Sequence, residues 1–278
     1  MLNATVKTII AAAAVALGVS ACADKEAQGA AELYAQTEQA LAERNFSGAI
    51  TLLDTLNSRY PKQTEVRRNA LQLRAKAIEG LTSDSIEAVS RRLAEATLAV
   101  QQLQPGFKYV KSTTGLDGYY IPSSASDKVM TGTMIQPRIT EKGYFYIVAN
   151  VQGRAIGLTS LDFIDGASSI SSSAISPVRV VKVEGSESAS FNQEDLVGVG
   201  QWILDHPQAS KVIIRGTKGD ATVKLDAKLR TQLADCYRYA SALQAQRLET
   251  VKREKFERML ATARDQIANL PNPEAEQK

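Results

Sequence analysis

Apolar residues recur with helical spacing in two long segments of the chain. Between residues 86 and 103 they alternate at intervals of three and four, and residues 226–270 contain no glycine or proline behind a candidate N-cap at Asp226. A stripe of this spacing covers one narrow face of a helix and is typical of packing against another long helix. We therefore expect residues 64–104 and 226–270 to form an antiparallel, coiled-coil-like pair, with Gly80 as a possible interruption.

The segment between these helices, residues 107–225, has a different pattern. Short β-branched and aromatic runs are separated by glycines, which predicts a mostly antiparallel β-rich domain inserted into a helical protein of the α+β class. The clearest predictions are a strand at 144–151 after a hairpin loop at 141–143, a helix at 192–204 and a final hairpin at 211–225. Residues 168–176 include six serines, and we expect a mobile loop there.

A third helical pattern occupies the start of the region 30–106. Phe46 and Ala49, followed by Pro61, have the spacing of an aromatic, an alanine and a helix-ending proline. This resembles the turn and second helix of a tetratricopeptide repeat, although no Trp or Gly stands at the first-helix positions of the motif. Stacked repeats need about three copies for stability. The resemblance therefore implies one helical hairpin rather than an array of repeats, with residues 64–79 as a possible third helix. The alternative is a helical hairpin that belongs to no particular family.

The N-terminus differs from the rest of the chain. Lys7 precedes an uncharged apolar run at 9–19, which is too short to span a bilayer and is typical of a signal peptide over residues 1–21. The following Val19-Ser20-Ala21-Cys22 resembles the lipobox of bacterial lipoproteins. That resemblance implies cleavage before Cys22 and a diacylglycerol on its thiol. The alternative is an ordinary signal peptide followed by a chance cysteine.

The lipobox resemblance also implies a location. Two or three acyl chains, palmitate among them, anchor a protein firmly in a membrane. We expect a lipidated tether at 22–29, a disordered tail at 271–278, and attachment to the bacterial cell envelope. Ala23 stands where an Asp is associated with inner-membrane retention, which favours the outer membrane; the periplasmic and surface faces both stay open.

Composition excludes several functions. Lys plus Arg exceed Asp plus Glu by only 33 to 30, which argues against a dedicated nucleic-acid binder. One histidine and two cysteines are too few for a histidine metal cage, a four-cysteine zinc site or a disulfide framework. We expect no metal and no cofactor.

Candidate catalytic chemistry is sparse. A Ser-His-Asp site around His206 would need a serine from 168–176, and no Gly-x-Ser-x-Gly motif is present. Cys236 lies on the apolar stripe of 226–270, where a small core residue is expected, and residues 217–220 are typical of a hairpin turn rather than a phosphate loop. We therefore predict no catalytic residues.

Tyrosines form the remaining cluster, and the speculative binding residues are Tyr119, Tyr120, Tyr144 and Tyr146. They can form a ligand-binding or glycan-stacking surface, or simply pack a sheet. The sequence thus favours a membrane-anchored lipoprotein that acts as a non-enzymatic binding or scaffolding module on a helical stalk. Its expected partner is a protein or glycan of the envelope, and a homodimer through 226–270 is possible. The alternative function is a hydrolase of cell-wall or glycan polymers.

Overall fold

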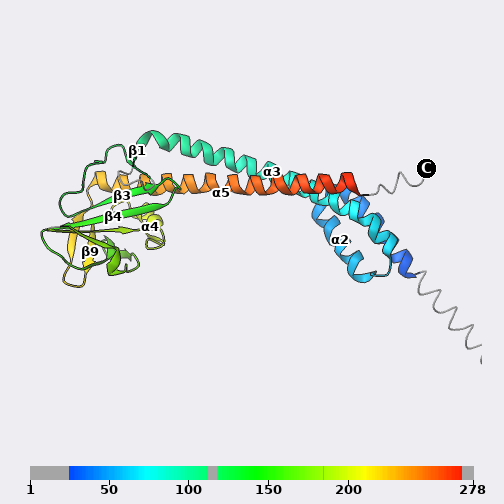
Figure 1. Cartoon of the computed structure of the whole chain (residues 1–278), viewed down its shortest axis with the longest axis horizontal. Coiled ribbons are helices and arrows are strands. Elements are labelled where there is room, and N and C mark those ends of the chain that lie inside the picture. Colours follow the sequence, from blue (N-terminus) through cyan, green and yellow to red (C-terminus); the bar gives the residue numbers. More distant parts are fainter. Residues whose placement is uncertain (1–24, 112–117, 184, 271–278) are drawn as a thin grey trace, which may run out of the picture. The chain divides into compact units, whose positions relative to one another are not determined.

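The computed structural model describes residues 25–111, 118–183 and 185–270 (Figure 1). It is a mixed α+β protein with N-terminal helices, a β-rich region of antiparallel sheets and a C-terminal helix, which confirms the predicted class. The segments predicted to be a signal peptide, a lipobox with Cys22 and a C-terminal tail at 271–278 lie outside the described residues.

The helices divide between two compact units. Residues 25–42 are helical, followed by α2 (Phe46–Arg59), α3 (Thr64–Leu103), α4 (Val199–Asp205) and α5 (Ala227–Asn269). Short 3-10 helices occupy Gln104–Gly106 and Pro177–Arg179. The first unit comprises residues up to Ser90 together with those from Val251 onward, and the second comprises Arg91–Thr250. The boundary between the units therefore falls inside α3 and α5.

The first unit is a small helical assembly. Asn45 caps α2 by accepting a hydrogen bond from the Gly48 N–H at 3.0 Å. The core is built from small and branched side chains of the first three helices, and Arg264 of α5 forms an ion pair with Glu79 of α3 at 2.9 Å. The buried residues include Ala30, Leu53, Leu56, Ala70 and Leu73.

The predicted interruption at Gly80 is wrong, because α3 is continuous through it. A Cβ atom at this position would overlap the ring of Phe46. The glycine therefore provides space for an aromatic side chain against the helix surface, at a helix-propensity cost of about 1 kcal/mol relative to alanine.

The second unit contains two antiparallel sheets. The six-stranded sheet has the order β1-β2-β3-β4-β8-β7 and the four-stranded sheet the order β10-β9-β5-β6. The first is built from β1 (Phe107–Val110), β2 (Tyr119–Pro122), β3 (Met134–Thr140), β4 (Phe145–Gln152), β7 (Val180–Val183) and β8 (Ser186–Phe191). The second is built from β5 (Leu158–Asp165), β6 (Ser168–Ser171), β9 (Lys211–Gly216) and β10 (Ala221–Lys224). The predicted strand at 144–151 and the hairpin at 211–225 are confirmed as β4 and as the pair β9–β10.

One hydrophobic core joins both sheets to α4 and α5. Alternate residues of β4 and β5 point into it, among them Ile147 and Phe163, because successive side chains of a strand face opposite sides. From α5 come Cys236 and Tyr239, and the Tyr239 ring stacks on Phe107 with centroids 4.5 Å apart. Burial, and then the nearby Asp235 charge, raise the pKa of the Cys236 thiol well above its usual value, so this cysteine is the inert core residue that its position predicted.

Two sequence predictions in this unit are wrong. Residues 168–171 form strand β6, paired with β5, rather than a mobile loop. The predicted helix at 192–204 is only α4, because residues 193–198 are turns and Gly198 has a left-handed φ of +77°. A left-handed residue cannot continue a right-handed helix, so α4 begins directly after it.

The long helices contact each other within each unit. In the second unit Arg92 donates to Glu249 at 2.9 Å and Gln246 donates to Thr97 at 3.1 Å, which is an antiparallel order. The Leu229 N–H donates to Asp226 at 2.7 Å, so Asp226 is the predicted N-cap of α5. The coiled-coil-like character of the pairing stays a prediction. None of the helices in the described ranges combines the length and apolarity required to cross a bilayer.

Candidate ligand-binding site

A pocket of about 590 Å³ opens in the second unit where β4 begins. Its floor is the aromatic run at 144–146, and its wall is the turn that follows β8. The lining residues are Thr140, Tyr144, Phe145, Tyr146, Asn192, Gln193, Glu194 and Val197. Concave sites of this size with aromatic walls and a few convergent polar groups are typical of ligand pockets.

The structure brings together three of the four predicted tyrosines. Tyr144 and Tyr146 line the pocket, and Tyr119 lies on the same face of the sheet, joined to Tyr146 through Arg138. The Arg138 guanidinium lies 4.3 Å from the Tyr119 ring centroid and directly opposite Tyr146 in the strand register. Tyr120 points to the other face, where it contacts the Tyr239 ring at 5.9 Å and belongs to the core.

The half-buried Tyr146 is a neutral hydrogen-bonding group. Burial raises the pKa of its phenol, while the neighbouring Arg138 cation opposes that rise. The net shift is upward, so the hydroxyl stays protonated at neutral pH and can both donate and accept.

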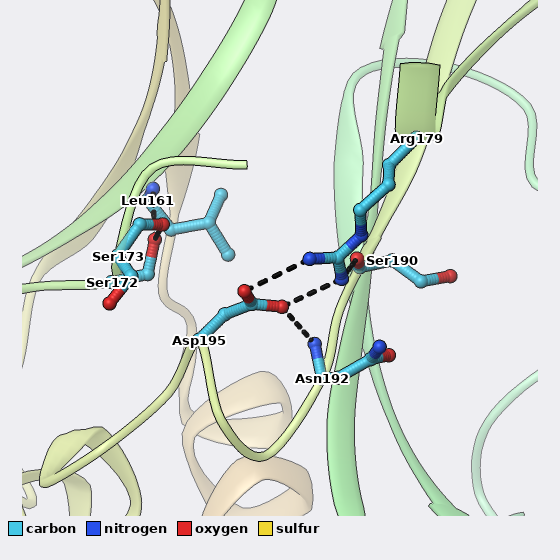
Figure 2. A network of polar contacts seen from close by, with 7 residues as sticks. All are labelled: Leu161, Ser172, Ser173, Arg179, Ser190, Asn192 and Asp195. Carbon is cyan, nitrogen blue, oxygen red and sulfur yellow. Dashed lines mark hydrogen bonds and ion pairs between the residues drawn. The ribbon is translucent and has the colours of Figure 1, made fainter. Parts of the chain in front are cut away.

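A partly buried ion pair between Arg179 and Asp195 lies beside the turn that carries the polar lining residues (Figure 2). The Arg179 guanidinium donates to both carboxylate oxygens of Asp195, at 3.0 and 2.7 Å, and also to the Ser190 carbonyl at 2.7 Å. The Asn192 N–H donates to Asp195 Oδ2 at 2.7 Å, and the Ser173 N–H donates to the Asp195 carbonyl at 2.8 Å. These bonds fix the turn that carries the polar lining residues. Beside them, Ser172 Oγ accepts from the Leu161 N–H at 3.0 Å.

Charge and hydrogen bonding together lower the pKa of Asp195. Burial alone would raise it, but the hydrogen bonds from Arg179 and the Asn192 N–H, with the Arg179 charge, outweigh that contribution. A carboxyl group whose pKa is lowered by folding stabilises the protein above its ordinary value of 3.8, and this contribution is lost as the pH falls through the lowered value.

We expect Asp195→Asn to lower the free energy of unfolding by about 1–3 kcal/mol at pH 7, because Arg179 loses its partner but keeps access to water. The difference from the parent protein should shrink as the pH falls below 3.8, because the Asp195 carboxylate is protonated first in the unfolded chain and, at lower pH, also in the folded protein. Urea titrations at pH 7 and pH 3, followed through Trp202 fluorescence, measure both effects. The exposed neighbour Glu194→Gln is the matched control, and a pH-independent difference for Asp195→Asn would contradict the assignment.

A second pocket of about 260 Å³ adjoins the first and shares three of its residues, Phe145, Gln193 and Val197. Two amides are fixed there, since Gln244 Nε2 donates to Gln193 Oε1 at 2.6 Å and to the Gly143 carbonyl at 2.9 Å. We call the two pockets together the tyrosine furrow. The remaining residues that line its second part are Leu196, Gly198, Gly200, Tyr237, Ala240, Ser241 and Gln244.

His206 has a serine partner, as a hydrolase would require. Its Nε2 lies 3.0 Å from Ser168 Oγ and its Nδ1 lies 2.9 Å from the Trp202 carbonyl oxygen. With Nδ1–H donating to that carbonyl, the neutral ring leaves Nε2 to accept from the serine hydroxyl. However, Trp202 Nε1 also donates to Ser168 Oγ at 3.3 Å, and the indole stacks on the imidazole at 4.1 Å. A backbone carbonyl, rather than a carboxylate, orients the histidine.

Among the described residues, no group of three or more histidine, cysteine, aspartate or glutamate side chains lies close enough together to hold a metal ion. The turn at 217–220 joins β9 to β10, as its sequence predicted.

Comparison with known proteins gives a match that covers the N-terminal helices. Residues 23–92 match the tetratricopeptide repeat family model. The N-terminal helical element is tetratricopeptide-like. The match covers about a quarter of the 278 residues and ends before the first strand of the β-rich unit. No curated protein and no solved structure shows significant similarity to the chain.

Proposed function

We propose that this protein is a membrane-anchored envelope lipoprotein that acts as a non-enzymatic binding or scaffolding module. The observation that carries the proposed binding role is the pocket lined by Tyr144 and Tyr146. The Arg179–Asp195 pair fixes the wall of this pocket before any ligand arrives. A preformed wall reduces the ordering cost of binding. Among the described residues that line this pocket there is one carboxylate and no histidine, cysteine or lysine, which suits binding better than catalysis.

The tetratricopeptide-like helices add a second binding element. Helical repeats of this kind present packed helix surfaces to other proteins, and residues 23–92 would follow the anchor directly. We propose that this unit contacts a protein partner in the envelope.

Lipidation is tested at Cys22. Cys22→Ala should abolish incorporation of labelled palmitate in a bacterial host and shift the protein out of the membrane fraction, because the thioether cannot form. Cys236→Ala is the matched control, since the buried Cys236 thiol is not available for acylation and that variant should keep the label. Persistent labelling of Cys22→Ala would refute the anchor.

The proposal includes a coiled-coil-like pairing of α3 with α5 in one chain. Its alternative is a homodimer in which residues 226–270 pair with those of a second copy. A mass measurement on the lipid-free protein spanning residues 23–278 separates the two: a monomer supports the intramolecular pair, and a dimer supports the alternative.

A second candidate function, hydrolysis of cell-wall or glycan polymers, is favoured by the 3.0 Å contact between Ser168 and His206. It predicts ester or glycan turnover by the purified protein that both Ser168→Ala and His206→Ala abolish. The binding proposal predicts no such turnover in the parent protein.

A further inference from the structure

We infer that the tyrosine furrow binds an uncharged oligosaccharide. This inference rests on the proposed binding function and names its ligand class. Sugar rings combine an apolar C–H face with a rim of hydroxyl groups that both donate and accept hydrogen bonds. A complementary site therefore needs flat apolar surfaces beside fixed polar groups that are themselves both donors and acceptors.

The aromatic part of the furrow meets the first requirement. Tyr144 is 43% exposed at the pocket, so a face of its ring is open to a ligand, and the half-buried Tyr146 is fixed beside Arg138. In the second part, the partly exposed Tyr237 ring is held edge to face against the buried Phe145 ring, with centroids 5.8 Å apart. Rings held in this way offer contact area at little entropic cost.

The polar part meets the second requirement. The Gln193 and Gln244 amides bond each other in both directions, with N–O distances of 2.6 and 3.4 Å, and Gln244 is also held by the Gly143 carbonyl. An amide has two N–H donors and an oxygen with two lone pairs, so this pair keeps hydrogen-bonding capacity for hydroxyls. Glu194 adds a carboxylate acceptor on the same wall.

Charge decides between sugar classes. Glu194 is the single charged group among the described residues that line the furrow. Arg138, the cation beside Tyr146, is already engaged by the Tyr119 ring and by Gln136 Oε1 at 2.7 Å. A phosphorylated, sulfated or carboxylated ligand would be repelled by the Glu194 carboxylate, and none of these lining residues is a cation that would offset the repulsion, whereas a neutral ligand meets no such repulsion.

Size favours a chain over a single sugar. The two pockets, of about 590 and 260 Å³, share Phe145, Gln193 and Val197, so they lie side by side within reach of one extended ligand. An oligosaccharide that spans them gains contacts from each pocket for one loss of translational freedom. We therefore expect tighter binding of tetrasaccharides than of the corresponding monosaccharides.

Calorimetric titration of the lipid-free protein with chitotetraose, cellotetraose and maltotetraose tests the inference, with a sulfated heparin tetrasaccharide as the anionic comparator. At least one neutral probe should bind, and Tyr144→Ala should weaken that binding by about tenfold or more. Tyr144→Phe should retain most of the affinity, because the ring face remains. Gln193→Ala should weaken binding as well.

Tyr109→Ala is the matched control, because Tyr109 has the same 43% exposure but belongs to the opposite face of the sheet. Thermal melting of each variant verifies that it is folded. Absence of binding to all three neutral probes, a preference for the sulfated probe, or equal losses in Tyr109→Ala and Tyr144→Ala would each overturn the inference. Palmitate labelling at Cys22 tests the proposed lipid anchor independently of these titrations. A negative titration would therefore refute the oligosaccharide inference without refuting the proposal of an anchored lipoprotein.

Discussion

Glu187→Ala should lower the free energy of unfolding of the β-rich unit by about 3–5 kcal/mol. Glu187 is 1% exposed and lies on β8, facing the core between the two sheets. Its Oε2 accepts the N–H groups of Ile156, Gly157 and Leu158 at 3.0, 2.8 and 3.3 Å. Removing the carboxylate leaves three neighbouring donors buried without an acceptor, each of which costs about 1–3 kcal/mol. The turn that leads into β5 would lose its attachment to the other sheet.

The measurement is a urea titration followed through Trp202, the single tryptophan of the chain, which lies in the same unit. The matched control is Glu187→Gln, which keeps an oxygen for the three N–H groups and loses the charge. The amide nitrogen of the glutamine takes the place of Glu187 Oε1. That oxygen has no hydrogen-bond partner among the described residues and lies 3.9 Å from the exposed Lys182 ammonium. We expect a loss of about 1–2 kcal/mol for Glu187→Gln. Equal losses in both variants would contradict the acceptor role.

Tyr239→Ala should destabilise the same unit by about 3–5 kcal/mol, because it leaves a cavity where α5 meets the six-stranded sheet. The side chain is 2% exposed, stacks on Phe107 and meets the Tyr120 ring edge to face. Aromatic pairs of this geometry contribute about 0.5–1.5 kcal/mol beyond the buried area. The residue thus secures the end of the sheet that begins with β1.

Tyr239→Phe is the control for this prediction. It retains the ring and both aromatic contacts, so its free energy of unfolding should remain within about 1 kcal/mol of the parent value. A large loss in Tyr239→Phe would assign the stability to the hydroxyl instead of to ring packing.

The sequence pattern predicted the elements whose signals are local. Strand β4 and the β9–β10 hairpin follow from apolar alternation with turn residues, and the start of α5 follows from the capping chemistry of Asp226. Strand β3 was not among the predicted strands, and Pro137, a residue that sheets tolerate at an edge or a bulge, lies in its centre. The structure accommodates it, since β2 pairs only with Ile139 and Thr140, and the neighbourhood of Pro137 faces no partner strand on that side.

Non-local contacts explain the other differences. The serines at 168–171 become a strand because β5 supplies their hydrogen bonds, and the turn before the shortened helix α4 is held by the bond of Asp195 to the distant Arg179. Neither partner can be inferred from local composition. The sequence identified Tyr144 and Tyr146 as candidates, but Gln193 and Gln244, which are 51 residues apart, become a pair only in the folded unit. The alternation of side chains along a strand could have separated the tyrosines, because Tyr119 and Tyr120 are neighbours in one strand and must face opposite sides of the sheet.

The division of α3 and α5 between two units has a consequence for synthesis. The first unit contains residues before Arg91 and after Thr250, so the ribosome makes the 160 residues of the second unit before the chain reaches Ala263 and Arg264. At about 5–20 residues per second this interval lasts roughly 10–30 s. During that time the tetratricopeptide-like helices lack the Arg264 ion pair to Glu79 and the buried Ala263 methyl. Nascent chains that stop before residue 250 would therefore expose these helices to proteases and chaperones, even though every residue of the matched repeat has already been made.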